Sequence, residues 1–108
     1  MKFVWVMGIF NLFKRKDMSS DITTYLQNGA IVLDVRTLME WDEGHSEGAI
    51  HVPLNLIPLK VDEIKAHNKQ VIAVCKSGGR SAQATQFLLN NGVDVINGGP
   101  WQNVDQHL

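Results

Sequence analysis

Short aliphatic runs alternate with stretches of helical apolar spacing along most of the chain. Continuous β-branched and aliphatic runs are typical of strands that are buried on both faces of a parallel sheet. They predict strands at residues 30–35, 49–52, 70–75 and 93–96. Apolar spacing and capping residues predict helices at residues 22–28, 38–43, 58–67 and 81–91. This alternation predicts an α/β fold, with a mostly parallel central sheet flanked by helices and right-handed crossovers.

Capping residues mark the ends of two of these helices. Ser19, Ser20 and Asp21 each offer an N-cap for the first helix, and Gly29 ends it. The sequence Thr37-Leu38-Met39-Glu40 matches a capping box, in which each end residue's side chain accepts a hydrogen bond from the other's backbone N–H. We therefore expect a short helix directly after the first strand.

The composition excludes several classes of protein. A chain of 108 residues supports one domain, which at this length can build a core without disulfides or a structural metal. The formal net charge of −1 argues against nucleic-acid partners, which need a concentrated excess of Lys and Arg. Cys75 is the one cysteine, so no intramolecular disulfide forms. A reducing compartment, the cytoplasm, is the predicted location.

The charge is unevenly spread, and it divides the chain in two. Residues 1–17 carry a net charge of +3, whereas residues 18–108 carry −4. The first segment is interpreted as a hydrophobic and basic N-terminal extension, and the second as the folded domain. The N-terminal extension contains an eleven-residue apolar stretch. As a helix this stretch would rise about 16 Å, too short to span a hydrocarbon core of about 30 Å. The alternative to a membrane span is weak peripheral contact with a membrane through residues 3–16.

The segment after the third predicted strand is the strongest candidate site. In open α/β sheets, ligands bind at the carboxyl ends of the strands, and Cys75 lies at such an end. Glycines in the following loop let its backbone N–H groups converge, and Ser81 opens the next helix. Lys76 and Arg80 add two cations. Such surroundings lower the pKa of a thiol and increase its thiolate fraction, so Cys75 is a candidate nucleophile.

Other site chemistries lack their signatures. The loop has neither the Gly-x4-Gly-Lys-Ser/Thr pattern of a phosphate-binding loop nor the Gly-x-Gly-x-x-Gly pattern of a dinucleotide site. One cysteine and scattered histidines do not make a zinc site, so we expect no metal and no cofactor. The histidines His45, His51, His67 and His107 offer no evident general base, and a Cys-His dyad is unsupported.

Three motifs, in order, resemble those of single-domain rhodaneses, a sulfurtransferase family, over about residues 20–104. The first is Val32-Leu33-Asp34-Val35-Arg36, followed by Glu40 and Trp41. The second is Gly44-His45 with Gly48-Ala49, and the third is the active-site loop Cys75-Lys76-Ser77-Gly78-Gly79-Arg80-Ser81. The chain departs from the family's pattern at Ser46-Glu47, usually an aliphatic residue and proline, and at Lys76, usually arginine. The resemblance implies a single rhodanese-like domain.

The resemblance also implies a reaction. The Cys75 thiolate would take a sulfane sulfur from a small anion such as thiosulfate and pass it, as a persulfide, to cyanide, a cellular thiol or a protein acceptor. The substrate would be bound by the loop residues Lys76, Ser77, Gly78, Gly79, Arg80 and Ser81. Asp34 and Arg36 are assigned to support, because such a pair more often orders a loop than performs chemistry.

Two other functions compete with sulfur transfer. A cysteine phosphatase or arsenate reductase would use Cys75 against a tetrahedral oxyanion, but those relatives resemble Cys-x5-Arg, one residue longer than the Cys75 to Arg80 segment. A non-catalytic binding module is the second alternative, since a fold alone does not establish an activity. Such modules commonly lack the cysteine, so its presence favours an enzyme.

Overall fold

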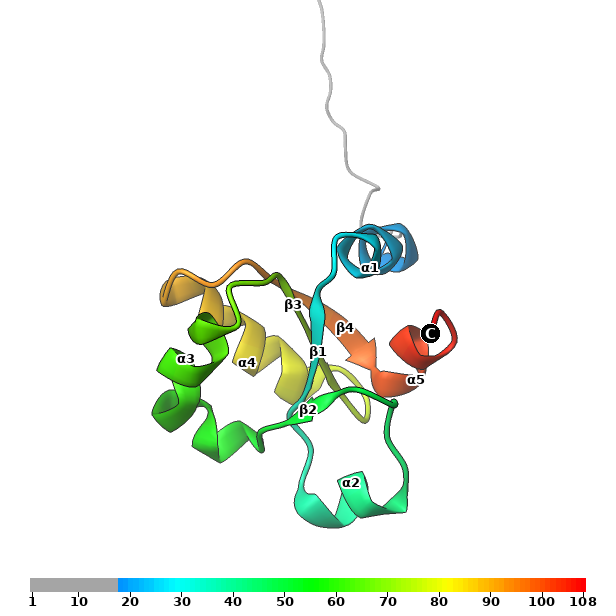
Figure 1. Ribbon diagram of the computed structural model, residues 1–108. Helices are drawn as coiled ribbons and strands as arrows, with labels where there is room; N and C mark the ends of the chain where they lie inside the picture. The colour runs from blue at the N-terminus through cyan, green and yellow to red at the C-terminus, as the bar shows by residue number, and fades with distance from the viewer. Residues whose placement is uncertain (1–17) are drawn as a thin grey trace, which may run out of the picture.

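A sheet of four parallel strands forms the centre of the structure, a computed structural model that describes residues 18–108 (Figure 1). The strands lie in the order β2-β1-β3-β4, and all three neighbouring pairs are parallel. Their bounds are β1 Ile31–Asp34, β2 Ile50–His51, β3 Val71–Cys75 and β4 Val95–Pro100. The predicted α/β fold with a parallel central sheet is therefore confirmed.

Helices cover both faces of this sheet. The helices of residues 18–108 are α1 Met18–Gln27, α2 Leu38–Glu43, α3 Ile57–Ala66, α4 Gly79–Asn90 and α5 Trp101–Asp105, with a 3-10 turn, η2, at Leu54–Leu56. Figure 1 shows α3 and α4 on one side of the strands, and α1 and α5 on the other. Side chains alternate along a strand, so β1, β3 and β4 each contribute residues to two separate cores, one on each face of the sheet.

Each of the two cores consists of buried apolar side chains from the strands and from the helices on one face of the sheet. Leu33 of β1 and Ala73 of β3 pack with Ile64 of α3 and Leu88 of α4. The adjacent residues of these strands, Val32, Ile72 and Val74, face the opposite side of the sheet. There they form a second core with Ile22 of α1 and Val104 of α5. All five residues of β3 are buried, so the strand that ends at Cys75 is fixed from both sides.

Three elements have boundaries that differ from the prediction by more than one residue. α1 begins at Met18, so Ser19, Ser20 and Asp21 lie inside the helix rather than at its N-cap. α4 begins two residues earlier than predicted, because Gly78 is its N-cap and the loop after Cys75 is correspondingly short. The third element is β4, near the end of the chain, which extends further than predicted.

β4 continues to Pro100, and the helix α5 that follows it was not predicted. Register shifts between Ala73 and Val74, which pair with Asn97 and Gly99, so Gly98 is the extra residue of a β-bulge. A Cβ at Gly98 would lie 2.7 Å from Ile72 Cγ2 and 3.2 Å from Val104 Cγ2. Glycine there lets α5 pack closely on the sheet, which the strand pattern alone does not reveal.

Residues 1–17 lie outside the described residues, and so does the hypothesis of membrane contact through residues 3–16. Among the helices of residues 18–108, none combines the length and the apolar character that a bilayer span needs.

Candidate active site

Cys75 lies at the carboxyl end of β3, between β1 and β4 at the centre of the sheet. Its side chain is fully buried. The next two residues, Lys76 and Ser77, are exposed, and the chain then turns at Gly78 into α4. Gly78 has a φ of +108°, in the left-handed region that favours glycine, so the tight turn depends on this residue type.

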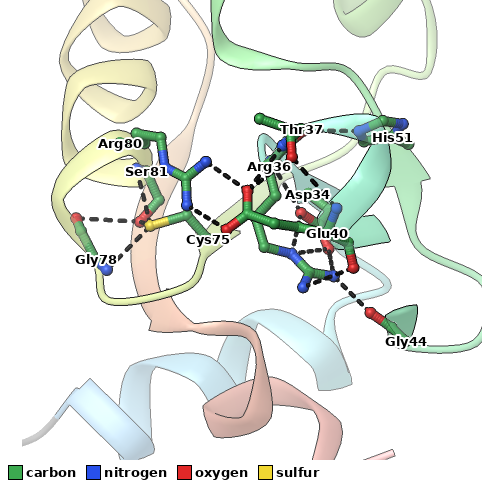
Figure 2. A network of polar contacts seen from close by, with 10 residues as sticks. All are labelled: Asp34, Arg36, Thr37, Glu40, Gly44, His51, Cys75, Gly78, Arg80 and Ser81. Atoms are coloured by element: carbon green, nitrogen blue, oxygen red, sulfur yellow. Dashed lines mark hydrogen bonds and ion pairs between the residues drawn. The ribbon is translucent and has the colours of Figure 1, made fainter. Parts of the chain in front are cut away.

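The turn directs hydrogen-bond donors at the sulfur (Figure 2). The Gly78 N–H donates to Cys75 Sγ at 3.0 Å and the Ser81 N–H at 3.4 Å, while Ser81 Oγ lies 3.3 Å from Sγ. Burial raises the pKa of the Cys75 thiol, but hydrogen bonds from the Ser81 hydroxyl and from the backbone of Ser81, Gly78 and Ser77 outweigh it. The net result is a lowered pKa. The loop therefore favours a thiolate.

Asn97, in the β-bulge of β4, connects that strand to the same loop. Its Oδ1 is 2.6 Å from Ser81 Oγ, and its Nδ2 donates to the Gly78 carbonyl at 3.2 Å. Sequence reasoning missed this residue, because a bulge changes the direction of a side chain in a way that alternation does not predict. The Asn-Gly-Gly run at residues 97–99 was the one local signal of irregular backbone.

Arg80 forms an ion pair with Glu40 of α2 rather than pointing freely toward the sulfur. Its two terminal nitrogens lie 2.6 and 2.9 Å from the two carboxylate oxygens. Glu40 also completes the predicted capping box, which is confirmed: its carboxylate accepts from the Thr37 N–H, and Thr37 Oγ1 accepts from the Glu40 N–H. The Arg80 guanidinium, followed by the Thr37 contacts, lowers the pKa of Glu40 to about 2. Glu40 therefore links α2 to the loop as a carboxylate.

Lys76 differs from Arg80 in its surroundings. It is exposed, and within residues 18–108 it makes no ion pair. Arg80 shares its charge with Glu40, so Lys76 is the loop cation whose charge is not offset by direct contact with a carboxylate.

Asp34 and Arg36 form a buried pair beside the loop. Arg36 donates to both carboxylate oxygens of Asp34, at 2.8 to 3.1 Å, and to the carbonyls of Glu40 and Gly44. Its guanidinium also lies 5.1 Å from the ring centroid of Trp101. Neither residue is hydrogen-bonded to Cys75. The pair connects the end of β1 to α2 and α5, the arrangement expected of a support.

Two of the four histidines, His45 and His51, stack on Trp41. The ring centroids of His45 and His51 lie 3.5 and 4.7 Å from that of Trp41. His45 Nδ1 contacts the Trp41 carbonyl at 2.8 Å, and His51 Nε2 contacts the Arg36 carbonyl at 2.7 Å. Carbonyls only accept, so these ring nitrogens donate. The pair therefore orders the segment between β1 and β2.

Replacing Glu40 with glutamine tests the link between α2 and the loop. Glutamine also completes a capping box, so the variant removes the ion pair and keeps the cap. The folded-state pKa of Glu40 is depressed, from 4.5 to about 2, so its contribution is present above pH 4.5 and is lost as the pH falls toward 2. We expect Glu40→Gln to lower the free energy of unfolding by about 1 kcal/mol at pH 7, and the difference to disappear at low pH.

Urea denaturation across pH measures this effect. Glu63→Gln is the matched control, because Glu63 also contacts a basic residue, Lys60, but is 72% exposed. We expect no measurable change there. A Glu40→Gln difference that persisted below pH 2, or a change as large in Glu63→Gln, would contradict the assigned role.

Comparison with known proteins matches residues 18–100 to the family model of the rhodanese-like domain. A sulfurtransferase of Allochromatium vinosum is 36% identical over 62 residues, which cover 57% of this chain and 57% of that protein. "Thiosulfate sulfurtransferase 16, chloroplastic" of Arabidopsis thaliana is 37% identical over 81 residues, covering 61% of this chain and 68% of that protein. Among solved structures, a rhodanese-related protein of Thermoplasma volcanium has a TM-score of 0.69 at 26% identity, covering 82% of this chain and 88% of that one.

Proposed function

The chain belongs to the rhodanese-like domain family, and from this premise we propose that it is a sulfurtransferase that carries a sulfane sulfur on Cys75. The observation that carries the proposal is the set of donors around the sulfur. Gly78 and Ser81 direct their N–H groups at Sγ, and the hydrogen bonds lower the pKa of the thiol. A thiolate is the nucleophilic form of cysteine, so the site holds a nucleophile that needs no separate base.

Sulfur transfer proceeds in two displacements at this atom. The Cys75 thiolate attacks the outer sulfur of thiosulfate, an S–S bond forms, and the original S–S bond breaks with its electron pair leaving on sulfite. Cyanide, a small thiol or a protein thiol then attacks the outer sulfur of the persulfide, and the electron pair of the broken bond returns to Cys75 as thiolate. The N–H groups of Gly78 and Ser81 stabilise the negative charge on Sγ before the first displacement and again after the second, when Cys75 is a thiolate.

The remaining loop residues divide between binding and support. Lys76 attracts the anionic donor, because it is exposed and forms no ion pair with any residue of 18–108. Arg80 contributes less charge than its position in the loop predicts, since Glu40 binds it through two contacts. The backbone of Ser77 and Gly79 completes the binding loop, and Asp34 with Arg36 supports it from the end of β1.

Intact-mass measurement tests the proposal. The protein is incubated with thiosulfate, freed of excess reagent and weighed, then exposed to cyanide and weighed again. We expect a gain of one sulfur atom that cyanide removes as thiocyanate. No adduct, or an adduct that cyanide leaves in place, would exclude this reaction. Faster hydrolysis of a phenyl phosphate than turnover of cyanide would instead support the phosphatase alternative, and neither activity would leave a binding module.

A further inference from the structure

The Ser81 hydroxyl lies within hydrogen-bond distance of three atoms that compete for its proton. Its Oγ is 3.3 Å from Cys75 Sγ, 2.6 Å from Asn97 Oδ1 and 3.2 Å from the Gly78 carbonyl. A serine hydroxyl carries one proton, so a single one of these contacts can receive it fully. Ser81 is fully buried, so bulk water does not supply the missing donors. The surrounding protein atoms therefore decide which of the three acceptors receives the Ser81 hydroxyl proton.

The neighbours of Asn97 fix the orientation of its amide. The Gly99 N–H donates to Oδ1 at 2.9 Å, and Nδ2 donates to the Gly78 carbonyl at 3.2 Å. A flipped amide would set donor against donor and acceptor against acceptor. Oδ1 therefore faces Ser81, and because a carbonyl oxygen only accepts, the 2.6 Å contact requires the Ser81 hydroxyl to donate.

When the Ser81 hydroxyl donates its hydrogen bond to Asn97 Oδ1, the lone pairs of Ser81 Oγ face the sulfur. A thiol suits this arrangement, because its S–H donates to Ser81 Oγ. A thiolate does not, because two acceptors would then face each other. Rotation of the Ser81 hydroxyl toward Sγ leaves Oγ and Asn97 Oδ1 without a shared proton, but a charged acceptor forms a stronger hydrogen bond than a neutral amide oxygen. Ionisation of Cys75 therefore favours rotation of the Ser81 hydroxyl from Oδ1 to Sγ.

We propose that Asn97 is a positioning residue of the sulfur-transfer site, which holds the Ser81 hydroxyl proton while Cys75 is a thiol and yields it to the sulfur when Cys75 becomes a thiolate. The inference rests on the proposed function and deepens it, since it names a residue that regulates how readily the sulfur ionises. The thiol proton leaves to solvent, and no covalent bond other than S–H changes. Asn97 Oδ1 keeps the hydrogen bond from Gly99 in both states.

The β-bulge accounts for the position of Asn97. Asn97 and Gly99 pair with the consecutive residues Ala73 and Val74, so one residue is inserted and the strand bends at the site. Gly98, the inserted residue, is buried and has no room for a side chain beside Ile72. Packing on the far face of the sheet therefore holds Asn97 against the loop.

Charged groups near the sulfur come from several elements, and none of them is altered in the test. Arg80 of α4 interacts electrostatically with Cys75, and Glu40 of α2 pairs with Arg80. Asp34 is the last residue of β1, Arg36 follows that strand, and Lys76 adjoins Cys75 in the loop. A change in the pH profile after replacing Asn97 with alanine therefore reports on the hydrogen bonds of Ser81.

Alkylation by iodoacetamide measures the thiolate directly, as a rate across pH. We compare the wild type with Asn97→Ala, Ser81→Ala and the double variant. Asn97→Ala removes the competing acceptor, so below the midpoint of the profile we expect alkylation about fivefold faster, the worth of one neutral hydrogen bond. Ser81→Ala removes the donor, so alkylation slows by about the same factor. The double variant matches Ser81→Ala, because the effect of Asn97 passes through Ser81.

Three outcomes would overturn the proposal: an unchanged rate in Asn97→Ala, a slower rate, as expected of a residue that merely clamps the loop, or a further change in the double variant. Asn97→Asp covers the case in which Asn97→Ala fails to fold. Its carboxylate keeps the acceptor and binds the Ser81 proton more strongly, but its charge also repels a thiolate directly. We therefore expect alkylation to slow more in the presence of Ser81 than in the Ser81→Ala background, and equal slowing in both backgrounds would contradict the proposal. A faster rate would contradict the proposal. Alkylation needs no sulfur donor, so these results stand apart from the sulfur-adduct experiment.

Discussion

Replacing Cys75 with serine should abolish sulfur loading and lower the turnover of thiosulfate and cyanide by about a thousandfold or more. A serine hydroxyl is a weak nucleophile unless a base removes its proton. Within residues 18–108, the hydrogen bonds of His45 and His51 go to backbone carbonyls, and no histidine is hydrogen-bonded to Cys75. The variant therefore loses the thiolate, and no histidine in the described part of the chain is hydrogen-bonded at this position to deprotonate the serine hydroxyl. Thiocyanate formation and the intact mass after incubation with thiosulfate measure the loss.

The fold is expected to survive this change. Serine has nearly the shape of cysteine, and its oxygen can accept from Gly78 and Ser81 in place of the sulfur. Urea denaturation of both proteins provides the control. Cys75 is the chain's one cysteine, so iodoacetamide should label the wild type once and the variant not at all. A sulfur adduct that remained on Cys75→Ser, or turnover near the wild-type rate, would place the chemistry elsewhere.

The strand, loop and helix around Cys75 were predictable because the signals are local. A buried aliphatic run ends at the cysteine, two glycines permit the turn, and an amphipathic helix follows, all within residues 70–91. The parallel sheet then places the end of this strand beside the end of β1. Fold class and the surroundings of the thiol follow from such short-range patterns.

The contacts that complete the site were not predictable, because they join residues far apart in the sequence. Glu40 was assigned a local capping role, which it has, but its ion pair with Arg80 spans 40 positions. That pair depends on the placement of α2 against α4, which no local pattern encodes. Asn97 reaches Ser81 through a bulge whose position follows from packing against Ile72 and Val104. Tertiary packing thus decides which side chains meet at the sulfur.

Replacing Arg36 with methionine should destabilise the domain by about 3 to 5 kcal/mol, the cost of leaving a buried charge without its partner. Arg36 is 5% exposed and Asp34 is fully buried, so neither is well solvated. Methionine retains much of the packing against Trp101 but removes the donors to Asp34 and to the carbonyls of Glu40 and Gly44. Urea denaturation at pH 7 measures the loss. Lys60→Met is the matched control, because it breaks an exposed ion pair with Glu63, and we expect less than about 1 kcal/mol there.

The double variant Asp34→Ala/Arg36→Met identifies the cause of that loss. Most of the cost in Arg36→Met comes from the carboxylate of Asp34, which stays buried with its main partner gone. Removing Asp34 as well eliminates that charge, so we expect the double variant to be more stable than Arg36→Met alone. Additive losses would instead show that the two residues act independently. Because the pair joins the end of β1 to α2 and α5, a coupled loss would also establish that this buried ion pair holds together the elements that surround the Cys75 loop.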